Sequence, residues 1–411
     1  MLITRIILSI RHLFYNKGWF ESTPTEVTSV CVGNLAVGGT GKTPMTELII
    51  RTLLEDSSDQ AEKVVREEDI QFNGLFTGID LYDGNDFGGK EEKDRCVRNV
   101  AVLSRGYKRK TSGFQQVVVE GGSAAIFGDE PLQVKKKFPD VTVAVDEDRV
   151  EGARLLTHPE EVASLPEKLR SKILFPSFPK AGYIILDDAY QHRRIIATKS
   201  ILLTTYDKPY FKDRLIPLGR LRDLRSRARA ADMIIVTKCP TVMNEWEKAE
   251  FAQKAGLKLY DLKTCKGTNA DGKSQFMLFA TMLYDKLLPV FPEGDARYTH
   301  SKTAVLFTGI ANDTPLQQHL CESFRIADHY VFPDHHRFSR SDMEKVTSSA
   351  RRYSTAIVIT TEKDAQRLYD FAADNPASFS PEMRRRCFYA PIRTMMLTPG
   401  EQSVLKEFLL G

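Results

Sequence analysis

The sequence lacks the features that mark several classes of protein. Its six cysteines lie far apart and form no C-x-x-C pair. That spacing predicts neither a zinc site nor a disulfide framework, and it favours a reducing compartment. The net charge is only +4 over 411 residues, which is too little to indicate a nucleic-acid-binding protein. The remaining composition is ordinary for a globular protein and sufficient for two or three domains.

The first twenty residues contain an apolar run that is too interrupted to cross a membrane. Arg5 and Arg11 divide the run and no small-residue cleavage site follows, so we expect neither a spanning helix nor a secretory signal. At helical spacing the run has an apolar face and a polar face. The apolar face carries Ile3, Ile6, Ile7, Ile10, Leu13 and Phe14, and the polar face carries Arg5, Ser9, His12 and Asn16. Two interpretations stay open: a helix in the interface of an anionic membrane, with arginines at the headgroups, and a helix docked on its own domain.

Short runs rich in β-branched residues alternate with helix-length segments along the rest of the chain. This pattern predicts an α/β protein with parallel sheets covered on both faces. The expected strands of a first set lie at 27–34, 98–107, 141–146, 181–190, 200–207 and 231–238. Those of a second set lie at 302–311, 354–364 and 386–393. Two segments between the sets, 256–265 and 274–286, are expected to pair as a linker, so we predict two α/β domains in sequence.

Residues 56–95 differ from both sets of strands. They contain twelve acidic and five basic residues, several glycines and few apolar side chains. A segment of that composition buries little apolar surface, so we predict a partly disordered surface insertion here.

A glycine-rich loop follows the first expected strand and precedes a helical pattern. The loop residues are Gly38, Gly39, Thr40, Gly41, Lys42 and Thr43. Backbone N–H groups of such a loop turn toward anionic oxygens, the lysine bridges phosphates, and the threonine hydroxyl ligates Mg²⁺. The first glycine of the usual phosphate-loop pattern is Ala36 here. The alternative is a glycine-rich turn with a chance lysine, but the order of strand, loop and helix favours phosphate binding.

A second polar site follows the expected strand at 181–190, which ends in Asp187 and Asp188. A carboxylate at the end of a neighbouring strand is where a phosphate loop needs an Mg²⁺ ligand. Two adjacent acids after a strand also fit a solvated turn. The phosphate loop in the same chain favours the metal site.

Several short motifs occur together in one order: "GNLAVGGTGKTP", "SRGY", "GDEP", "DDAYQH", "IPLGRLRD", "TGIA", "FPDHHRF" and "TEKDA". The ordered set, from about residue 1 to about residue 365, resembles the tetraacyldisaccharide 4'-kinase family of lipid A biosynthesis. Two motifs depart from the family pattern, since "DDAYQH" stands for "DDGLQH" and "IPLGRLRD" for a proline-containing "PxGPLRE". The insertion at 56–95 is also longer than is usual for the family.

The resemblance implies ATP- and Mg²⁺-dependent phosphorylation of the 4'-hydroxyl of a tetraacylated glucosamine disaccharide 1-phosphate. It implies two α/β/α sandwich domains, the first with a P-loop NTPase-like sheet, joined by a two-stranded linker, with the active site between them. We expect a membrane-associating helix at 1–24, a kinase domain at 25–255, and linker strands with a smaller domain at 256–411. The resemblance also implies a peripheral position on the cytoplasmic face of the bacterial inner membrane, with the N-terminal helix on the bilayer.

The resemblance assigns further site residues. Asp129 of "GDEP" resembles the family's general base, assisted by His335 of "PDHH". Arg222 is assigned to phosphate stabilisation and Asp223 to the metal neighbourhood, beside Thr43 and the two carboxylates named above. Without the family pattern, Asp129 reads as a helix cap and the histidine as a loop residue.

Three functions remain to be separated. The first is the lipid kinase, and the second is a nucleotide-dependent regulatory module at the membrane surface. The third is a peripheral membrane scaffold in which the loop is structural. Pro240 stands where guanine-specific proteins carry aspartate in their Asn/Thr-Lys-x-Asp signature, which disfavours GTP. The candidate base Asp129 also argues for the kinase over the regulatory module.

Overall fold

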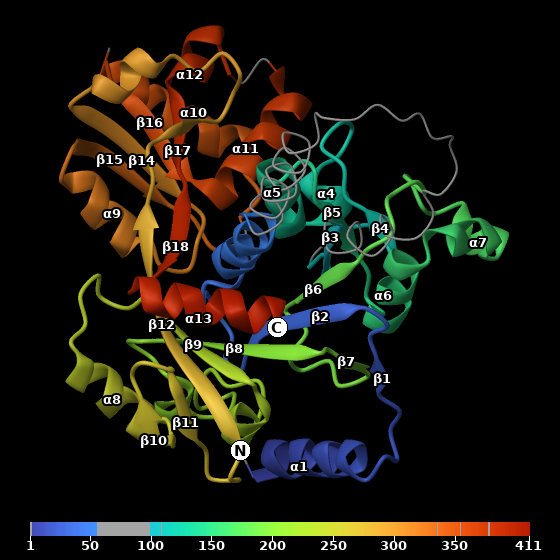
Figure 1. The fold of residues 1–411 in the computed structure, drawn as a ribbon. Helices are drawn as coiled ribbons and strands as arrows, with labels where there is room; N and C mark the ends of the chain where they lie inside the picture. Colours follow the sequence, from blue (N-terminus) through green and yellow to red (C-terminus); the bar gives the residue numbers. More distant parts are fainter. Residues whose placement is uncertain (1, 56–98, 108, 335, 354, 377–378) are drawn as a thin grey trace, which may run out of the picture.

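A computed structural model describes residues 2–55, 99–107, 109–334, 336–353, 355–376 and 379–411. The expected insertion at 56–95 and the expected site residue His335 lie outside the described residues. Two mixed sheets rich in parallel strands, each covered by helices, make up the described part of the chain (Figure 1).

The larger sheet has a parallel centre and antiparallel edges. Its order is β10-β11-β12-β9-β8-β2-β6-β3-β5-β4, and the strands from β12 to β5 run parallel. Their side chains are buried almost throughout, which explains why the sequence reads as continuous apolar runs. The bounds are β2 (Thr28–Asn34), β3 (Val100–Ser104), β4 (Gln115–Gln116), β5 (Thr142–Val145), β6 (Tyr183–Asp187), β8 (Lys199–Thr205), β9 (Met233–Thr237), β10 (Lys258–Asp261), β11 (Lys266–Thr268) and β12 (Ser274–Tyr284).

Helices cover both faces of this sheet, and each face has its own apolar core. One core joins the sheet to the helix over residues 42–55, to α5 (Asp129–Lys137) and to α13 (Pro399–Leu410). The other joins it to α6 (Arg149–Thr157), α8 (Glu245–Lys254) and the 3-10 turns η2 (Tyr210–Lys212) and η3 (Arg225–Ala230). The remaining short elements are α4 (Ala124–Phe127), η1 (Pro159–Ser164), α7 (Glu167–Arg170), and the pair β1 (Thr23–Pro24) with β7 (Ile195–Ile196).

The smaller sheet is formed by residues 288–390 and has the order β13-β17-β16-β14-β15. One face packs on α10, α11 and α12, and the other on α9. The bounds are β13 (Leu288–Pro289), η4 (Ala296–His300), β14 (Thr303–Thr308), α9 (Thr314–Cys321), β15 (Arg325–Val331), α10 (Arg340–Arg352), β16 (Ile357–Thr361), α11 (Glu362–Asp374), α12 (Pro381–Arg386) and β17 (Cys387–Ala390).

Two strands connect the sheets, but they are not the pair that the sequence predicts. The segments 256–265 and 274–286 are not neighbours, because β11 lies between β10 and β12. Instead, the second half of β12 pairs antiparallel with β18 (Ile392–Met396). The chain then returns to the larger sheet, where α13 packs. The division into domains at residue 256 stays a prediction, since β10–β12 and α13, which follow that point, pack with the larger sheet.

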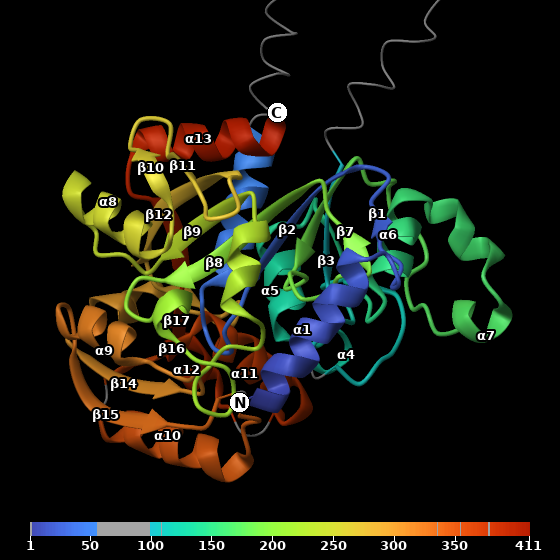
Figure 2. The same ribbon diagram turned by 90° about the horizontal axis from the view of Figure 1, so that it is seen from below.

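The N-terminal helix α1 (Leu2–Asn16) lies across the lower surface of the molecule, as the view from below shows (Figure 2). Leu8 packs against the second core of the larger sheet. The helix is therefore docked on the α/β body by at least part of its surface.

Candidate active site

The loop between β2 and the following helix has the conformation of an anion-binding loop. Gly38 and Gly41 have φ angles of 100° and 81°, which glycine adopts without strain. Two side chains hold the loop in place. Asn34 Nδ2 donates to Thr40 Oγ1 at 2.6 Å, and Thr237 Oγ1 at the end of β9 donates to the Thr40 carbonyl oxygen at 2.8 Å. The loop is thus fixed by two strands of the sheet rather than by its glycines alone.

The helix after the loop begins at residue 42. Lys42 and Thr43 therefore stand in its first turn, where backbone N–H groups lack intrahelical partners and attract anions. Pro44 also fits there, because the N–H that proline lacks would have no partner in the first turn. The structure thus brings the lysine, the threonine hydroxyl and free amides to one end of the loop.

The two expected carboxylates lie beside this loop. Asp187 ends β6, which pairs in parallel with β2 and places Asp187 opposite Val32. Lys42 Nζ lies 3.6 Å from Asp188 Oδ2. Thr46 Oγ1, from the helix over residues 42–55, donates to Asp187 Oδ1 at 3.3 Å. The two motifs that the sequence separates by about 140 residues therefore meet at one edge of the sheet.

Arg222 reaches the same place from the arginine-rich segment. Its Nη2 donates to Asn34 Oδ1 at 2.6 Å and to Asp188 Oδ1 at 3.0 Å. The backbone explains the approach, because hydrogen bonds of 2.7 Å join residues 35–37 to residues 220–222. The guanidinium is therefore held against the glycine loop by the chain itself.

Charges at this edge are crowded and unequally compensated. Burial, together with the nearby carboxylates of Glu130 and Asp188, raises the pKa of Asp187 to about 7. For Asp188, burial acts in the same direction but is outweighed by the cations of Lys42 and Arg222, which lower its pKa. The two adjacent acids thus differ: one is ionised and paired, and the other is a buried group whose charge is poorly compensated.

Asp129 lies at the start of α5, where the smaller sheet's helix α11 packs against it. Gly128 holds the N-cap position and Asp129 is the first helical residue, so Asp129 does not occupy the cap that the alternative interpretation predicts. Arg367 of α11 donates from Nε to Asp129 Oδ2 at 2.9 Å, and its Nη2 donates to the same oxygen. Arg367 Nη1 also donates to Asp364 Oδ1 at 2.9 Å. The expected partner His335 lies in the part of the chain that is not described.

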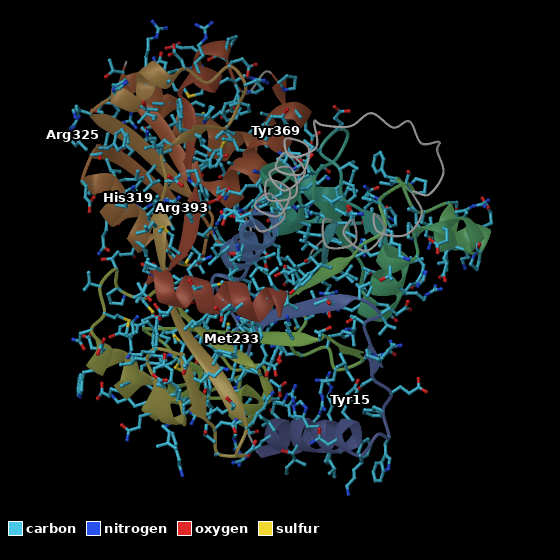
Figure 3. All side chains as sticks on the ribbon, in the orientation of Figure 1. Tyr15, Met233, His319, Arg325, Tyr369 and Arg393 are labelled. Atoms are coloured by element: carbon cyan, nitrogen blue, oxygen red, sulfur yellow. The ribbon has the colours of Figure 1, made fainter. Side chains whose placement is uncertain are left out.

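Further contacts between α5 and α11 bring more charge to the site. Lys363 Nζ donates to Glu130 Oε1 at 2.9 Å. Burial opposes ionisation of Glu130, but the cations of Lys363 and Lys42 lower its pKa. Farther along the interface, Lys136 Nζ of α5 lies 4.7 Å from the ring centroid of Tyr369 of α11, which is labelled in Figure 3. The candidate base therefore lies where the helices of the two sheets meet.

The Asp223 carboxylate makes a contact that the sequence does not predict. Its Oδ1 lies 2.6 Å from His12 Nε2 of α1 and accepts from the Leu224 amide at 2.7 Å. The residue is buried, and its Oδ2 has no hydrogen-bond partner in the described structure. The expected position of Asp223 near a metal stays a prediction, but one of its two carboxylate oxygens already contacts His12 of α1.

Helix α1 docks through Leu8, Arg11 and His12, and most of its apolar face is exposed. His12 is buried against Asp223, and Arg11 Nη2 donates to the Gln191 carbonyl oxygen at 3.0 Å. The membrane interpretation expects Arg11 at the lipid headgroups. In the structure Arg11 instead contacts the protein. No helix in the described ranges has both the length and the apolar character needed to span a bilayer. Exposed side chains form the opposite face: Ile6 at 47%, Ile7 at 60%, Ile10 at 47% and Leu13 at 47%.

Comparison with known proteins identifies the family to which the chain belongs. The family model described as "Tetraacyldisaccharide-1-P 4'-kinase" matches residues 1–62 and 94–410. The chain belongs to this family. A tetraacyldisaccharide 4'-kinase of Parabacteroides distasonis is 38% identical over 84% of this chain and 76% of its own length. One of Flavobacterium johnsoniae is 33% identical over 95% of this chain and 89% of its own.

A solved structure of a family member supports the fold. LpxK of Aquifex aeolicus, crystallised in complex with ATP, superposes with a TM-score of 0.60 at 22% identity, covering 99% of this chain and 96% of that chain. The segment that the family model leaves unmatched, 63–93, falls inside the expected insertion.

The first departure of this kinase from its family pattern has a structural explanation. Tyr190 replaces leucine in "DDAYQH", and its Cβ lies only 2.6 Å from where a Cβ on Gly33 would be. Leucine has the same Cβ, so glycine on β2 is required by either residue and the difference lies in the tyrosine ring and hydroxyl. Its hydroxyl donates to the Arg227 carbonyl oxygen at 2.7 Å, so the substitution connects the aspartate turn to η3.

In the second departure, "IPLGRLRD", an ion pair takes the place of a proline. Arg220 stands where the family carries proline, and its Nε donates to Asp213 Oδ2 at 2.8 Å while its backbone N–H donates to Asp213 Oδ1 at 3.0 Å. An ion pair thus holds the loop before Arg222 where a proline ring would stiffen it.

Several residues that surround the site were not predicted from the sequence. Glu130 is part of the quoted "GDEP", and its position next to Asp129 is a signal that could have been used. Asn34 ends the first strand inside a quoted motif. Arg367 lies three residues after "TEKD", and only the packing of α11 on α5 reveals its partner.

Proposed function

We propose that this chain transfers the γ-phosphoryl group of ATP to the 4'-hydroxyl of a tetraacylated glucosamine disaccharide 1-phosphate. The observation that carries the proposal is the convergence of Lys42, Asp188 and Arg222 on the glycine loop. Phosphoryl transfer depends mostly on positioning and on cations placed where charge develops. The identity of the substrates rests on the names of the relatives.

Each residue has a role in this proposal. Gly38, Gly39, Thr40 and Gly41 offer backbone N–H groups to the phosphates, and Lys42 bridges their oxygens. Arg222 stabilises the charge on the transferring group. The bond from the 4'-oxygen to phosphorus forms as the bond from phosphorus to the β-γ bridging oxygen breaks.

Asp129 accepts the proton that the 4'-hydroxyl loses during attack. Arg367 holds the Asp129 carboxylate through two hydrogen bonds to one oxygen, which fixes the orientation of the carboxylate. His335 assists in the proposal as the family pattern implies. Because Asp129 and Arg367 come from helices of different sheets, the packing of α11 on α5 sets the orientation of the base.

The donor set at the end of β6 fits Mg²⁺. Thr43, Asp187 and Asp188 offer the hard oxygens that Mg²⁺ prefers, and the carboxylate of Glu130 adds to the negative charge beside them. Within the described ranges no three His, Cys, Asp or Glu side chains group as a ready metal cage, and Mg²⁺ ordinarily takes several ligands from water and phosphate. When bound, the ion would neutralise phosphate charge. Asp223, with Oδ1 on His12, supports the Arg222 loop from behind in this proposal.

The lipid acceptor requires access to a bilayer surface. The exposed isoleucines of α1 suit the acyl boundary of a membrane, and anchoring of this kind needs no spanning helix. We therefore place the kinase peripherally on the cytoplasmic face of the bacterial inner membrane in this proposal, with no nucleic-acid partner.

A transfer assay with labelled ATP and the lipid acceptor tests the function. Asp129→Asn should leave ATP binding intact and slow turnover by roughly 10²–10⁴-fold, the usual effect of removing a general base. Arg367→Lys serves as a matched variant that keeps a cation near Asp129 but loses the two-pronged contact. Loss of ATP binding in Asp129→Asn would make Asp129 a nucleotide or metal ligand. No transfer by the wild-type chain would favour the regulatory-module alternative.

A further inference from the structure

A cavity of about 510 Å³ lies between α1, the turn after β6, η3 and the hairpin before β12. It is distinct from the glycine loop, and its lining is strongly basic. Arg193, Arg227, Arg229 and Lys273 line it together with a single carboxylate, that of Asp271.

Two of these four cations are neutralised by the protein. Arg229 Nη1 donates to Asp271 Oδ1 at 2.6 Å, and Lys273 Nζ donates to Asp232 Oδ1 at 2.7 Å. These two residues therefore bring no surplus charge to the cavity.

Arg193 and Arg227 make no ion pair within the described part of the chain. Arg193 instead donates to the His12 carbonyl oxygen at 3.2 Å and to Asn16 Oδ1 at 2.9 Å. Its guanidinium carbon lies 4.9 Å from the ring centroid of Tyr15, which is labelled in Figure 3.

Arg227 is held in a similar way. Its guanidinium carbon lies 5.5 Å from the ring centroid of Tyr190, and its Nε is buried without a hydrogen-bond partner in the described structure. Rings under both guanidinium groups restrict their planes, so the side chains are organised in advance.

Neighbouring cations disfavour each other unless an anion joins them. Burial, followed by the guanidinium groups of Arg227 and Arg11, lowers the pKa of Arg193. Two arginines that line one cavity and make no ion pair with a carboxylate in the described residues suit an oxyanion with several acceptor oxygens, such as a phosphate.

The position of the cavity indicates the source of the phosphate. Leu13 borders the cavity and also belongs to the exposed apolar face of α1. A group bound there lies at the level where headgroups meet acyl chains, if α1 lies in a bilayer interface. We propose that Arg193 and Arg227 bind the headgroup phosphate of an anionic membrane phospholipid. This proposal rests on the proposed membrane association and adds a headgroup site to it.

Vesicle sedimentation tests the proposal with the full chain. The probes are vesicles of phosphatidylcholine with phosphatidylglycerol, and vesicles of phosphatidylcholine alone, both without substrate. Arg227→Lys keeps the charge but loses the planar, multi-donor contact. We expect it to weaken binding to the anionic vesicles about tenfold, the effect of losing one hydrogen bond to a charged group. Arg229→Lys, from the same cavity, is the matched control and should bind as the wild type does.

A melting curve establishes that each variant is folded, and Arg193→Lys provides a second variant. The KM for the lipid substrate in neutral detergent, without phospholipid, should change less than about twofold in Arg227→Lys, because the substrate phosphate is not the ligand. Equal binding of Arg227→Lys and wild type to anionic vesicles would overturn the site and indicate general charge attraction only. A KM raised tenfold in detergent with unchanged vesicle binding would assign the cavity to the substrate. If the wild type binds neither vesicle, the membrane association itself fails, and this proposal with it.

Discussion

The double substitution Ile6→Asp with Ile10→Asp tests whether α1 is the membrane contact. Both side chains are 47% exposed on the face of the helix that points away from the protein. The docking contacts of α1 come from other positions, chiefly His12 and Arg11. The change therefore alters the outward face and leaves the docked face in place.

The expected effect on membrane binding follows from the exposed area. Full burial of a large aliphatic side chain contributes ~1.5–3 kcal/mol, so the exposed halves of two isoleucines together contribute roughly 1.5–3 kcal/mol. A basic residue near an anionic membrane surface contributes about 1 kcal/mol to binding. We assign the same magnitude with the opposite sign to each added carboxylate, so the two together oppose binding by roughly 2 kcal/mol. The sum of roughly 3.5–5 kcal/mol corresponds to about a 300- to 4,000-fold weaker partition to anionic vesicles. Exposed substitutions of this kind change the free energy of unfolding by only about 0.5 kcal/mol in either direction.

Sedimentation with anionic vesicles measures membrane binding, and a melting curve measures the stability of the fold. The apparent KM for lipid presented in a bilayer should rise much more than the KM for ATP. Leu174→Asp with Val331→Asp is the matched control, because both residues are exposed, neither belongs to α1, and the charge changes equally. Unchanged vesicle binding with an intact melt would remove α1 from membrane association. Unchanged binding with a clearly lowered melting temperature would mean that the apolar face stabilises the fold.

Three further predictions concern the site and the core. Lys42→Ala should lower turnover by more than about 100-fold in a chain that stays folded, since it removes a cation from the developing phosphate charge; near-normal turnover would contradict the phosphate-loop assignment. Asp188→Asn should raise the Mg²⁺ concentration for half-maximal rate by about tenfold or more, and an unaltered Mg²⁺ titration would exclude this carboxylate as a ligand. Burial raises the pKa of Asp146 from 3.8 to about 7, so folding favours its protonated form and stability is lost as pH rises from about 4 through about 7. Asp146→Asn should therefore match the wild type near pH 4 and exceed it by roughly 2–4 kcal/mol at pH 8, and equal unfolding free energies at pH 8 would contradict this.

Local signals account for the parts of the site that the sequence predicted. Asp187 and the glycine loop each follow an apolar strand, and parallel pairing of β2 with β6 brings the two strand ends together. The adjacency of Lys42 and Asp188 follows from that rule alone. The linker was predicted wrongly because a short hairpin strand, β11, occupies the place beside β12 that was assigned to residues 256–265.

Contacts between distant elements account for what the sequence did not predict. Arg367 and Asp129 are separated by 238 positions, and His12 and Asp223 by 211. No periodicity in either segment specifies these partners, since they depend on how α11 packs on α5 and how α1 docks. Asp223 was assigned to the metal neighbourhood because the resemblance implies that its motif contributes to the active site, but residues 222 and 223 form a bend and one Asp223 oxygen contacts His12 of α1.

The same reasoning explains why neither interpretation of α1 was complete. The sequence correctly separates an apolar from a polar face, but amphipathicity alone does not say which face meets the protein. In the structure the docked side combines apolar Leu8 with Arg11 and His12. Arg11 contacts the loop that follows Asp188, and His12 contacts the residue that follows Arg222. The helix with the exposed apolar face therefore supports both loops that contribute side chains beside Lys42. Displacing α1 would consequently affect Asp188 and Arg222 through these neighbouring residues, so a membrane-binding defect and a catalytic defect must be measured separately in any variant of its docked side.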